Sequence, residues 1–331
     1  MTPPPSSERG AALLAVLVLV AVIGAIAATG LEKLRLATAL AVNTAAADQA
    51  RAMASGVEAL AALRIDDILA ADARKTTLAG NWSGRERTIP LPAGGGTAGV
   101  TVRDGGNCFN LNSVASGAQA GALAPRPAGT AQFAGLMRLL GIPPSDAIRV
   151  AQSAGDWVDG DSDQSLNGAE DAAYLSLAEP YRTANNFFAD VSELRAVNGV
   201  TPELYVRLRP WLCALPTTEL SPINVNTLAP EQAPLLAMIA PDQLRLADAQ
   251  AALAARPANG WDSLSDFYRL PMLASLVLPD DAMQQPQLRT RWFRIDLRIA
   301  AGDSAFYERA LVDARIAPAR VASRSWGEEE E

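Results

Sequence analysis

Carboxylates crowded into one short stretch are the side chains of this chain best suited to chemistry. The stretch 159–171, DGDSDQSLNGAED, has acids at positions 1, 3, 5 and 12, counted from Asp159. An EF-hand loop has this spacing, because alternate side chains of a curling loop point inward and a later glutamate closes the shell. Calcium prefers six to eight oxygen ligands, and carboxylates, amides and carbonyls supply them here. The stretch therefore predicts a calcium site.

The loop departs from an EF-hand at its turn. Gln164 stands at position 6, where the sharp turn normally needs glycine, and Gly168 comes late. We therefore expect calcium in an irregular loop. The predicted ligands are Asp159, Asp161, Asp163, Glu170 and Asp171. Two alternatives stay open: a solvated loop between helices, or a glycosidase acid/base pair, which would need two separated carboxylates in a substrate cleft.

The composition excludes several other kinds of site. The 331 residues include no histidine, which removes histidine-based catalytic triads and every metal site that uses imidazole. Two cysteines are too few for zinc fingers or iron–sulfur clusters. A net charge of −8 argues against a nucleic-acid partner, which would require a basic face. These exclusions favour a non-enzymatic protein.

The two cysteines, Cys108 and Cys213, allow two interpretations. They form one disulfide if the chain matures in an oxidising compartment, or they are two independent buried thiols. An apolar segment near the N-terminus directs the chain to a membrane and so favours the disulfide.

The elements that position the acidic loop belong to a long helical region, residues 113–285. A weak internal repeat lies within it: the polar string 109–113, FNLNS, recurs in kind as 223–227, INVNT. Each copy leads to two predicted helices, 132–140 with 147–158 and 230–239 with 243–255. Two similar helix pairs packed together predict a compact all-α domain of the sterile-alpha-motif-like (SAM-like) kind.

Short alternating segments flank this helical region and predict antiparallel strands at 87–91, 100–103, 292–299 and 307–316. The fold class is therefore α+β, with residues 64–112 and 286–318 forming a small α/β domain into which 113–285 is inserted. The chain ends in four glutamates, and we expect 319–331 to be a disordered acidic tail.

The N-terminal part predicts one long helix, residues 11–63, that begins inside a membrane. Residues 11–30 carry no charge, and a helix of this length spans about 30 Å, the thickness of a bilayer core. No proline interrupts the helix before Leu63. A secretory signal peptide cut near residues 25–29 is the competing interpretation, although the helical pattern continues through that point.

The leader, residues 1–10, resembles that of a type IV prepilin. It ends in Glu8-Arg9-Gly10 before a small residue, and such leaders are cut after the glycine, which would leave Ala11 as a usually N-methylated terminus. The fifth mature residue in that family is usually glutamate, but here it is Ala15. This omission, together with a large helical insertion, is typical of the K-type minor pseudopilin of type II secretion. The string 108–112, CFNLN, also resembles a recurrent motif of that type.

The resemblance implies a type IV pilin-like fold with calcium in the helical insertion, around the string 168–171, and with Asn185 or Glu193 as further ligands. It also implies a non-enzymatic subunit at the tip of the pseudopilus, which initiates or caps assembly for export across the outer membrane. The implied partners are I-type and J-type minor pseudopilins and prepilin peptidase. The chain would be a single-pass protein of the inner membrane with its bulk in the periplasm. A signal-anchored periplasmic binding or hydrolytic domain that uses the acidic loop is the alternative.

Overall fold

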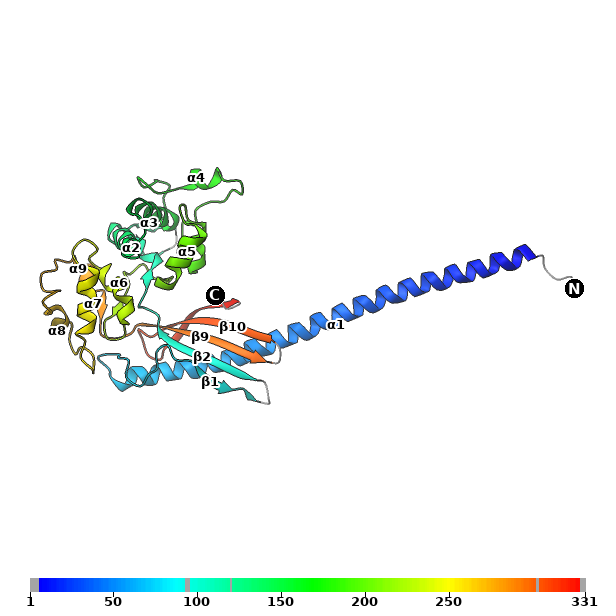
Figure 1. The fold of residues 1–331 in the computed structure, drawn as a ribbon, viewed down its shortest axis with the longest axis horizontal. Helices are drawn as coiled ribbons and strands as arrows, with labels where there is room; N and C mark the ends of the chain where they lie inside the picture. The colour runs from blue at the N-terminus through cyan, green and yellow to red at the C-terminus, as the bar shows by residue number, and fades with distance from the viewer. Residues whose placement is uncertain (1–5, 93–95, 120, 302–303, 328–331) are drawn as a thin grey trace.

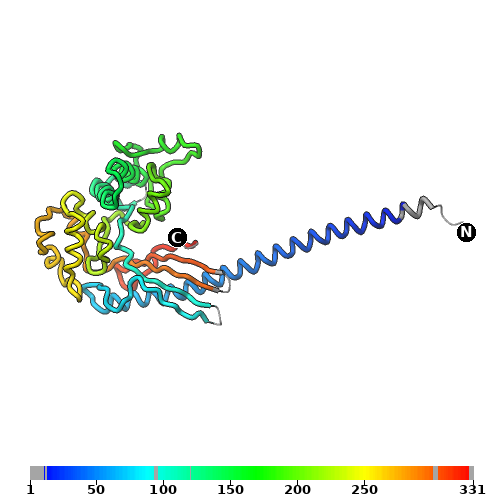
Figure 2. The backbone as a smooth tube through the Cα atoms, in the orientation of Figure 1, coloured from blue at the N-terminus to red at the C-terminus, as the bar shows by residue number. Residues whose placement is uncertain are grey.

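One helix dominates the shape of the molecule. The computed structural model describes residues 6–92, 96–119, 121–301 and 304–327, and its first element is helix α1, Ser6–Ala71. The N-terminal half of α1 projects alone, and its C-terminal end lies within a folded body of sheet and helices (Figures 1 and 2). Among the described residues, α1 is the one helix long and apolar enough to cross a membrane, which fits a single-pass anchor.

The two halves of α1 have different surroundings. The large apolar side chains from Leu13 to Val42 are exposed. The second half buries one stripe of residues spaced three or four apart, which is the face of a helix that packs on a core. The stripe comprises Ala50, Ala54, Val57, Ala61, Ile65 and Leu69. The predicted end at residue 63 was therefore too early, because the buried stripe continues to Leu69 and no proline or glycine stops the helix there.

A five-stranded antiparallel sheet covers this stripe. Its strands are β1 (Arg87–Pro90), β2 (Thr97–Asp104), β9 (Trp292–Ala301), β10 (Ser304–Asp313) and β11 (Arg320–Gly327), in the order β1-β2-β9-β10-β11. Alternate residues of β9, including Phe293, Ile295 and Leu297, join the buried cluster beside α1. The first four strands confirm the predicted hairpins. The long helix with a small antiparallel sheet and a helical insertion is the predicted α+β architecture.

The C-terminal prediction needs correction. Residues 320–327 form strand β11, which pairs with β10 from Tyr307↔Gly327 to Asp313↔Arg320. The expectation of a disordered tail at 319–331 rested on the final glutamates, Glu328–Glu331, which lie outside the described residues. The sequence of β11 is short and mostly polar, so its pairing depends on contacts with β10 and α1 that no local pattern reveals.

A carboxylate pair is buried where α1 meets the last two strands. Glu58 of α1 and Glu308 of β10 are 5% and 3% exposed. Arg324 of β11 donates from Nε and Nη2 to the two oxygens of Glu58, at 2.6 and 2.8 Å, and lies 4.0 Å from Glu308. Burial and then the neighbouring Glu58 carboxylate raise the pKa of Glu308 to about 7. One arginine thus serves two carboxylates, and Glu308 holds a proton below neutral pH.

We expect Glu308→Gln to raise the melting temperature by a few degrees above about pH 7 and to change it little at about pH 5. The folded-state pKa of Glu308 lies above its ordinary value of 4.5, so the wild-type protein loses stability as the pH rises through this interval. Glutamine cannot ionise and should remove that loss. Thermal melts across this pH range test the prediction, with the exposed Glu179→Gln as control; parallel melting curves for Glu308→Gln and wild type would contradict it.

The predicted helical insertion lies between β2 and β9. Its α-helices are α2 (Pro127–Leu139), α3 (Pro144–Val158), α4 (Asp171–Leu175), α5 (Pro202–Leu208), α6 (Ala233–Ala237), α7 (Leu246–Ala254), α8 (Leu264–Tyr268) and α9 (Asp280–Met283). Short 3-10 turns lie at Leu111–Val114, Val191–Ala196, Arg209–Trp211 and Pro230–Gln232. Two-residue ladders join β3 (Phe109–Asn110) to β6 (Leu212–Cys213), β4 (Ala115–Ser116) to β5 (Ala124–Pro125), and β7 (Ile223–Asn224) to β8 (Pro286–Gln287).

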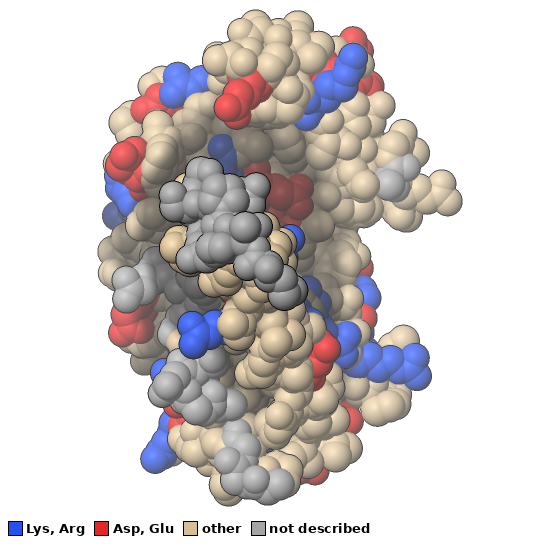
Figure 3. Space-filling view, turned by 90° about the vertical axis from the view of Figure 1, so that its right-hand side faces the viewer, with Lys and Arg blue, Asp and Glu red and all other residues tan. Residues whose placement is uncertain are grey.

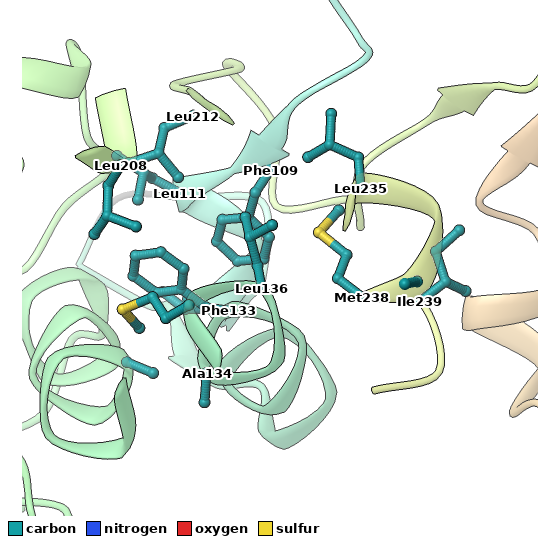
Figure 4. Packing of buried hydrophobic residues seen from close by; sticks show 14 of the residues in the cluster. Phe109, Leu111, Phe133, Ala134, Leu136, Leu208, Leu212, Leu235, Met238 and Ile239 are labelled. Carbon is teal, nitrogen blue, oxygen red and sulfur yellow. The ribbon is translucent and has the colours of Figure 1, made fainter. Parts of the chain in front are cut away.

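The insertion has its own core. Phe109 of β3 stacks on Phe133 of α2 with ring centroids 4.7 Å apart. On its other side Phe109 approaches Leu235 of α6 and the adjoining Met238 (Figure 4). The first and second helix pairs therefore share one buried cluster, and the insertion folds as a unit.

Asparagines account for the internal repeat. In the first copy the Asn110 side chain accepts the N–H of Asn112, and in the second copy Asn224 accepts the N–H of Asn226. The second asparagine of each copy then bonds a distant backbone: Asn112 bonds Phe188, and Asn226 bonds Trp261. All four asparagines are buried, so the repeated string is a structural device that ties each helix pair to its stem.

The two cysteines are bonded, as the membrane-directing segment favoured. The Cys108–Cys213 disulfide joins residues 105 apart in sequence, with their Cα atoms separated by 5.8 Å. It lies beside the β3–β6 ladder, in which Asn110 pairs with Cys213. The bridge therefore closes the first helix pair and the acidic loop into a single covalent loop at the base of the insertion.

Candidate metal centre

The acidic loop connects the end of α3 to the start of α4. Asp159 is the residue that ends α3, where its N–H bonds the carbonyl of Gly155. Glu170 caps the start of α4, where its Oε2 accepts the N–H of Asp171. Both ends of the loop are thus fixed by helix termini, and the intervening residues return the chain so that the two carboxylates meet.

Three of the predicted ligands converge. One carboxylate oxygen from each of Asp159, Asp161 and Glu170 lies within 4.8 Å of the others. Asp159 is fully buried and Glu170 is 5% exposed. Both oxygens of Asp159 and Oε1 of Glu170 have no hydrogen-bond partner among the described residues. Buried carboxylates without partners are costly, so this set of oxygens fits a bound cation.

Two further buried oxygens belong to the same neighbourhood. Oδ1 of Asp156, in the last turn of α3, and Oδ1 of Asn185 also have no partner among the described residues. The N–H of Asn185 bonds the carbonyl of Trp157 at 3.0 Å, which holds this residue against the end of α3. Asn185 adopts φ of +46°, a left-handed conformation that asparagine tolerates better than most residues. Asn185, one of the two further ligands that the resemblance implied, therefore lies against the end of α3, at a residue two positions before Asp159.

The carboxylates of the acidic loop act on one another electrostatically. Burial, followed by the charges of Asp161, Asp156 and Glu170, raises the pKa of Asp159 to about 7. Burial is also the largest cause that raises the pKa of Glu170 and of Asp156. A divalent cation would remove this mutual repulsion and hold all of them ionised.

Three predicted ligands have other contacts. Asp163 is exposed, and its backbone N–H bonds Asp161 Oδ1 at 2.8 Å. Asp171 accepts from the backbone and side chain of Thr183, both at 3.0 Å, and from Arg182. Glu193 accepts the N–H groups of Ala189 and Asp190 at 2.9 and 3.1 Å, and so caps a 3-10 turn. The structure does not bring these three into the convergent set.

Asp156 was not among the ligands predicted from the sequence. It lies three residues before Asp159 on the same helix, and residues at this spacing share one helix face. That spacing from Asp159 was the available signal in the sequence. Gly168 also has a defined role, because a Cβ built there would lie 2.0 Å from Asp156 Oδ2. The late glycine therefore lets the loop pass close to Asp156, while Gln164 stabilises the turn through a bond to the Gly168 carbonyl.

The arrangement fits the predicted cation site in an irregular loop. The donors are all oxygen, from carboxylates and an amide, which suits a hard cation such as calcium. Glycosidase pairs keep their two carboxyl groups about 5–9.5 Å apart with room for a sugar, whereas here three oxygens converge within 4.8 Å. The geometry thus favours the cation over the acid/base pair.

Comparisons with known proteins point to one family. The family model described as type II secretion system protein K matches residues 107–217 in its first domain and 223–291 in its second. The first matched range holds the disulfide loop and the acidic loop, and the second holds the second helix pair.

Individual relatives point to the same family as the family model. The chain is 34% identical to type II secretion system protein K of Pectobacterium carotovorum and 34% identical to that of Klebsiella pneumoniae, in each case over 97% of both chains. The Aeromonas hydrophila protein is 37% identical over 78% of this chain and 79% of its own. A chain of the GspK-GspI-GspJ complex from enterotoxigenic Escherichia coli is 30% identical, with a TM-score of 0.72, and the match covers 85% of this chain and 97% of that one.

Proposed function

Because this chain belongs to the protein K family of the type II secretion system, and is thus a minor pseudopilin, we propose that it occupies the tip of the pseudopilus. The observation that carries this proposal is the size and place of the helical insertion, which lies at the end of the molecule opposite the N-terminus (Figure 1). When the molecule is viewed from the N-terminal side, the folded body extends well above and below α1 (Figure 3). A subunit this broad would obstruct another subunit stacked beyond it.

The apolar segment supports the same position. A carboxylate at the fifth mature position of a pilin-like subunit can pair with the terminal amine of its neighbour inside the membrane, where an unpaired charge would be costly. Residues 11–30 contain no acid, so this chain cannot offer that pair. It can therefore begin or cap an assembly but is poorly suited to an interior place.

Immunogold labelling tests the tip position directly. In pseudopili assembled with this chain, an antibody against the helical insertion should label one end of the filament alone. Label distributed along the filament would contradict the proposal, while the family assignment would stand.

The partners and the location follow from the same proposal. The solved GspK-GspI-GspJ complex supports I-type and J-type minor pseudopilins as partners of this chain. The exposed apolar half of α1 would anchor the chain in the inner membrane, with the folded body in the periplasm. There the disulfide could form. Prepilin peptidase would remove residues 1–10.

We expect the mature chain to begin at N-methylated Ala11. Intact-mass measurement of the chain from membranes should give a mass lacking residues 1–10 and increased by one methyl group. Gly10→Val should leave the leader attached, because the cleavage follows glycine, whereas Gly30→Val should be processed normally. A wild-type chain that begins at Met1 or near residue 30 would contradict this expectation.

We further propose that the convergent oxygens bind calcium. Asp156, Asp159, Asp161, Glu170 and Asn185 would hold the ion through oxygens that otherwise lack partners or repel one another. When bound, the ion would neutralise the buried charge and fix the acidic loop against the end of α3. Its role would be structural, because the family assignment and the absence of histidine both favour a subunit that does no chemistry.

A further inference from the structure

The outer face of the sheet, opposite α1, carries a group of arginines. Arg103 of β2, Arg294 and Arg298 of β9 and Arg309 of β10 lie on this face, and we call them the arginine face. The strand register places Arg103 directly opposite Arg294, and Arg309 directly opposite Asp296. Like charges directly opposite on neighbouring strands destabilise a sheet. The register of the sheet therefore places two like charges next to each other on this face.

The acids near this face do not balance its charge. Asp296 accepts Nε of Arg294 and Nε of Arg309, each at 3.0 Å, and lies 3.9 Å from Nε of Arg103. The side chain of Glu86 lies over Gly99, which pairs with Arg298. Within the part of the chain that the structure describes, four arginines thus face these two carboxylates, although the net charge of the whole chain is −8.

Arg103, Arg294 and Arg309 keep hydrogen-bond donors that Asp296 does not use. All three contacts with Asp296 use Nε, so the terminal Nη groups of Arg103, Arg294 and Arg309 are not used by that carboxylate. Their side chains are 49%, 40% and 52% exposed. The planar guanidinium presents paired N–H donors that match a carboxylate or phosphate with two parallel bonds. The face is therefore built to receive a further anionic group.

We propose that the arginine face docks an acidic segment of a neighbouring pseudopilin subunit, which places at least two carboxylates on the Nη groups of Arg103, Arg294 and Arg309. This proposal rests on the assembly described under the proposed function and names a contact surface within it. The acidic segment would supply the charge that the face lacks and would offset the repulsion between Arg103 and Arg294.

The position of the face excludes a lipid headgroup as its partner. Arg309 is next to Ala310, which pairs with Arg324, and Arg324 bonds Glu58 of α1. Glu58 lies 28 residues beyond Gly30, the end of the apolar segment, and 28 helical residues extend about 42 Å. Headgroups at the end of that segment are too distant to contact the face. A nucleic acid is disfavoured by the overall negative charge.

The test compares two double variants of the full chain, purified in detergent micelles with the I-type and J-type pseudopilins of its own system. Arg103→Gln/Arg309→Gln should weaken the complex about ten-fold, or about 1.4 kcal/mol, and should remove most of its dependence on salt. The control, Arg245→Gln/Arg269→Gln, changes two exposed arginines of the insertion whose ion pairs are local. It should bind as the wild type does. Thermal melts of both variants should show the cooperative transition of the wild type.

Each outcome decides between the proposals. Equal affinity of wild type and Arg103→Gln/Arg309→Gln, with equal salt dependence, would overturn the docking surface while leaving the assembly intact. Failure of the wild-type chain to bind either pseudopilin would instead contradict the proposed partners. Sedimentation with anionic lipid vesicles that is lost in Arg103→Gln/Arg309→Gln would assign the face to a membrane and overturn the inference. Arg309→Lys keeps the positive charge and should bind more tightly than Arg103→Gln/Arg309→Gln. It should still bind more weakly than the wild type, since lysine cannot form two parallel bonds.

Discussion

Calcium added to the metal-free protein is expected to raise its melting temperature by about ten degrees. A ligand at a thousand times its dissociation constant stabilises a folded protein by about 4 kcal/mol, and each kcal/mol corresponds to roughly 2–4 degrees for a domain of this size. The insertion offers candidate ligands, because Asp159, Asp161 and Glu170 converge and three of their buried oxygens have no hydrogen-bond partner in the described part of the chain. Differential scanning calorimetry in EGTA and in calcium measures the shift.

Asp159→Asn should raise the melting temperature in EGTA and lower it in calcium, relative to the wild type. Without metal, the pKa of Asp159 stands at about 7 against an ordinary value of 3.8, so its ionisation destabilises the fold progressively as the pH rises between these values. The asparagine variant avoids that loss and should melt above the wild type in EGTA at pH 8. In calcium it lacks a charged ligand and should melt below the wild type. A purely structural aspartate would not change sign.

Asp242→Asn is the matched control for this experiment. Asp242 is an exposed acid of the same insertion, paired with Arg138 at 3.1 Å, and is distant from the acidic loop in the sequence. It should shift the melting temperature equally with and without calcium. If EGTA leaves the melting temperature of metal-loaded wild type unchanged, the calcium proposal fails and the loop is a solvated connection between helices.

The elements that local patterns specify were predictable. Alternation in β9 follows from Phe293, Ile295 and Leu297 on one face, and the repeated asparagine strings mark the two starts of the helix pairs. The apolar half of α1 was evident from its lack of charge. These features depend on residues close together in sequence, which is why they needed no tertiary information.

The remaining features depend on contacts between distant residues. The end of α1 at Ala71 and the pairing of β11 require the sheet and helix to be placed together, with Arg324 reaching Glu58 across 266 residues. The candidate metal centre shows the same limit. The sequence supplied Asp159, Asp161 and Glu170, but it could not show that Asp171 and Glu193 bond other partners or that Asp156 turns toward the loop. The local spacing of acids identified the loop, and the tertiary contacts show which of its carboxylates converge.

Removing the disulfide is expected to destabilise the insertion by about 4–5 kcal/mol. In the chain-entropy model a crosslink stabilises the fold by restricting the unfolded chain, and a loop of roughly a hundred residues gives about this value. The Cys108–Cys213 bridge closes a loop with a sequence separation of 105, and the ladder that it supports, β3 with β6, is only two residues long. Cys108→Ser/Cys213→Ser should therefore unfold at distinctly lower denaturant concentration than the wild type.

The loss should be uneven across the insertion. Residues 109–212 lie inside the covalent loop and hold the acidic loop, whereas the second helix pair, 223–285, lies outside it. Hydrogen exchange of Cys108→Ser/Cys213→Ser should therefore accelerate most within 109–212. Reduced wild type serves as the control that separates loss of the bond from substitution of the cysteines, and both should behave alike. Equal denaturation midpoints for the oxidised wild type and the variant would contradict the prediction, because the shared core of Phe109, Phe133 and Leu235 would then hold the insertion together without the bridge.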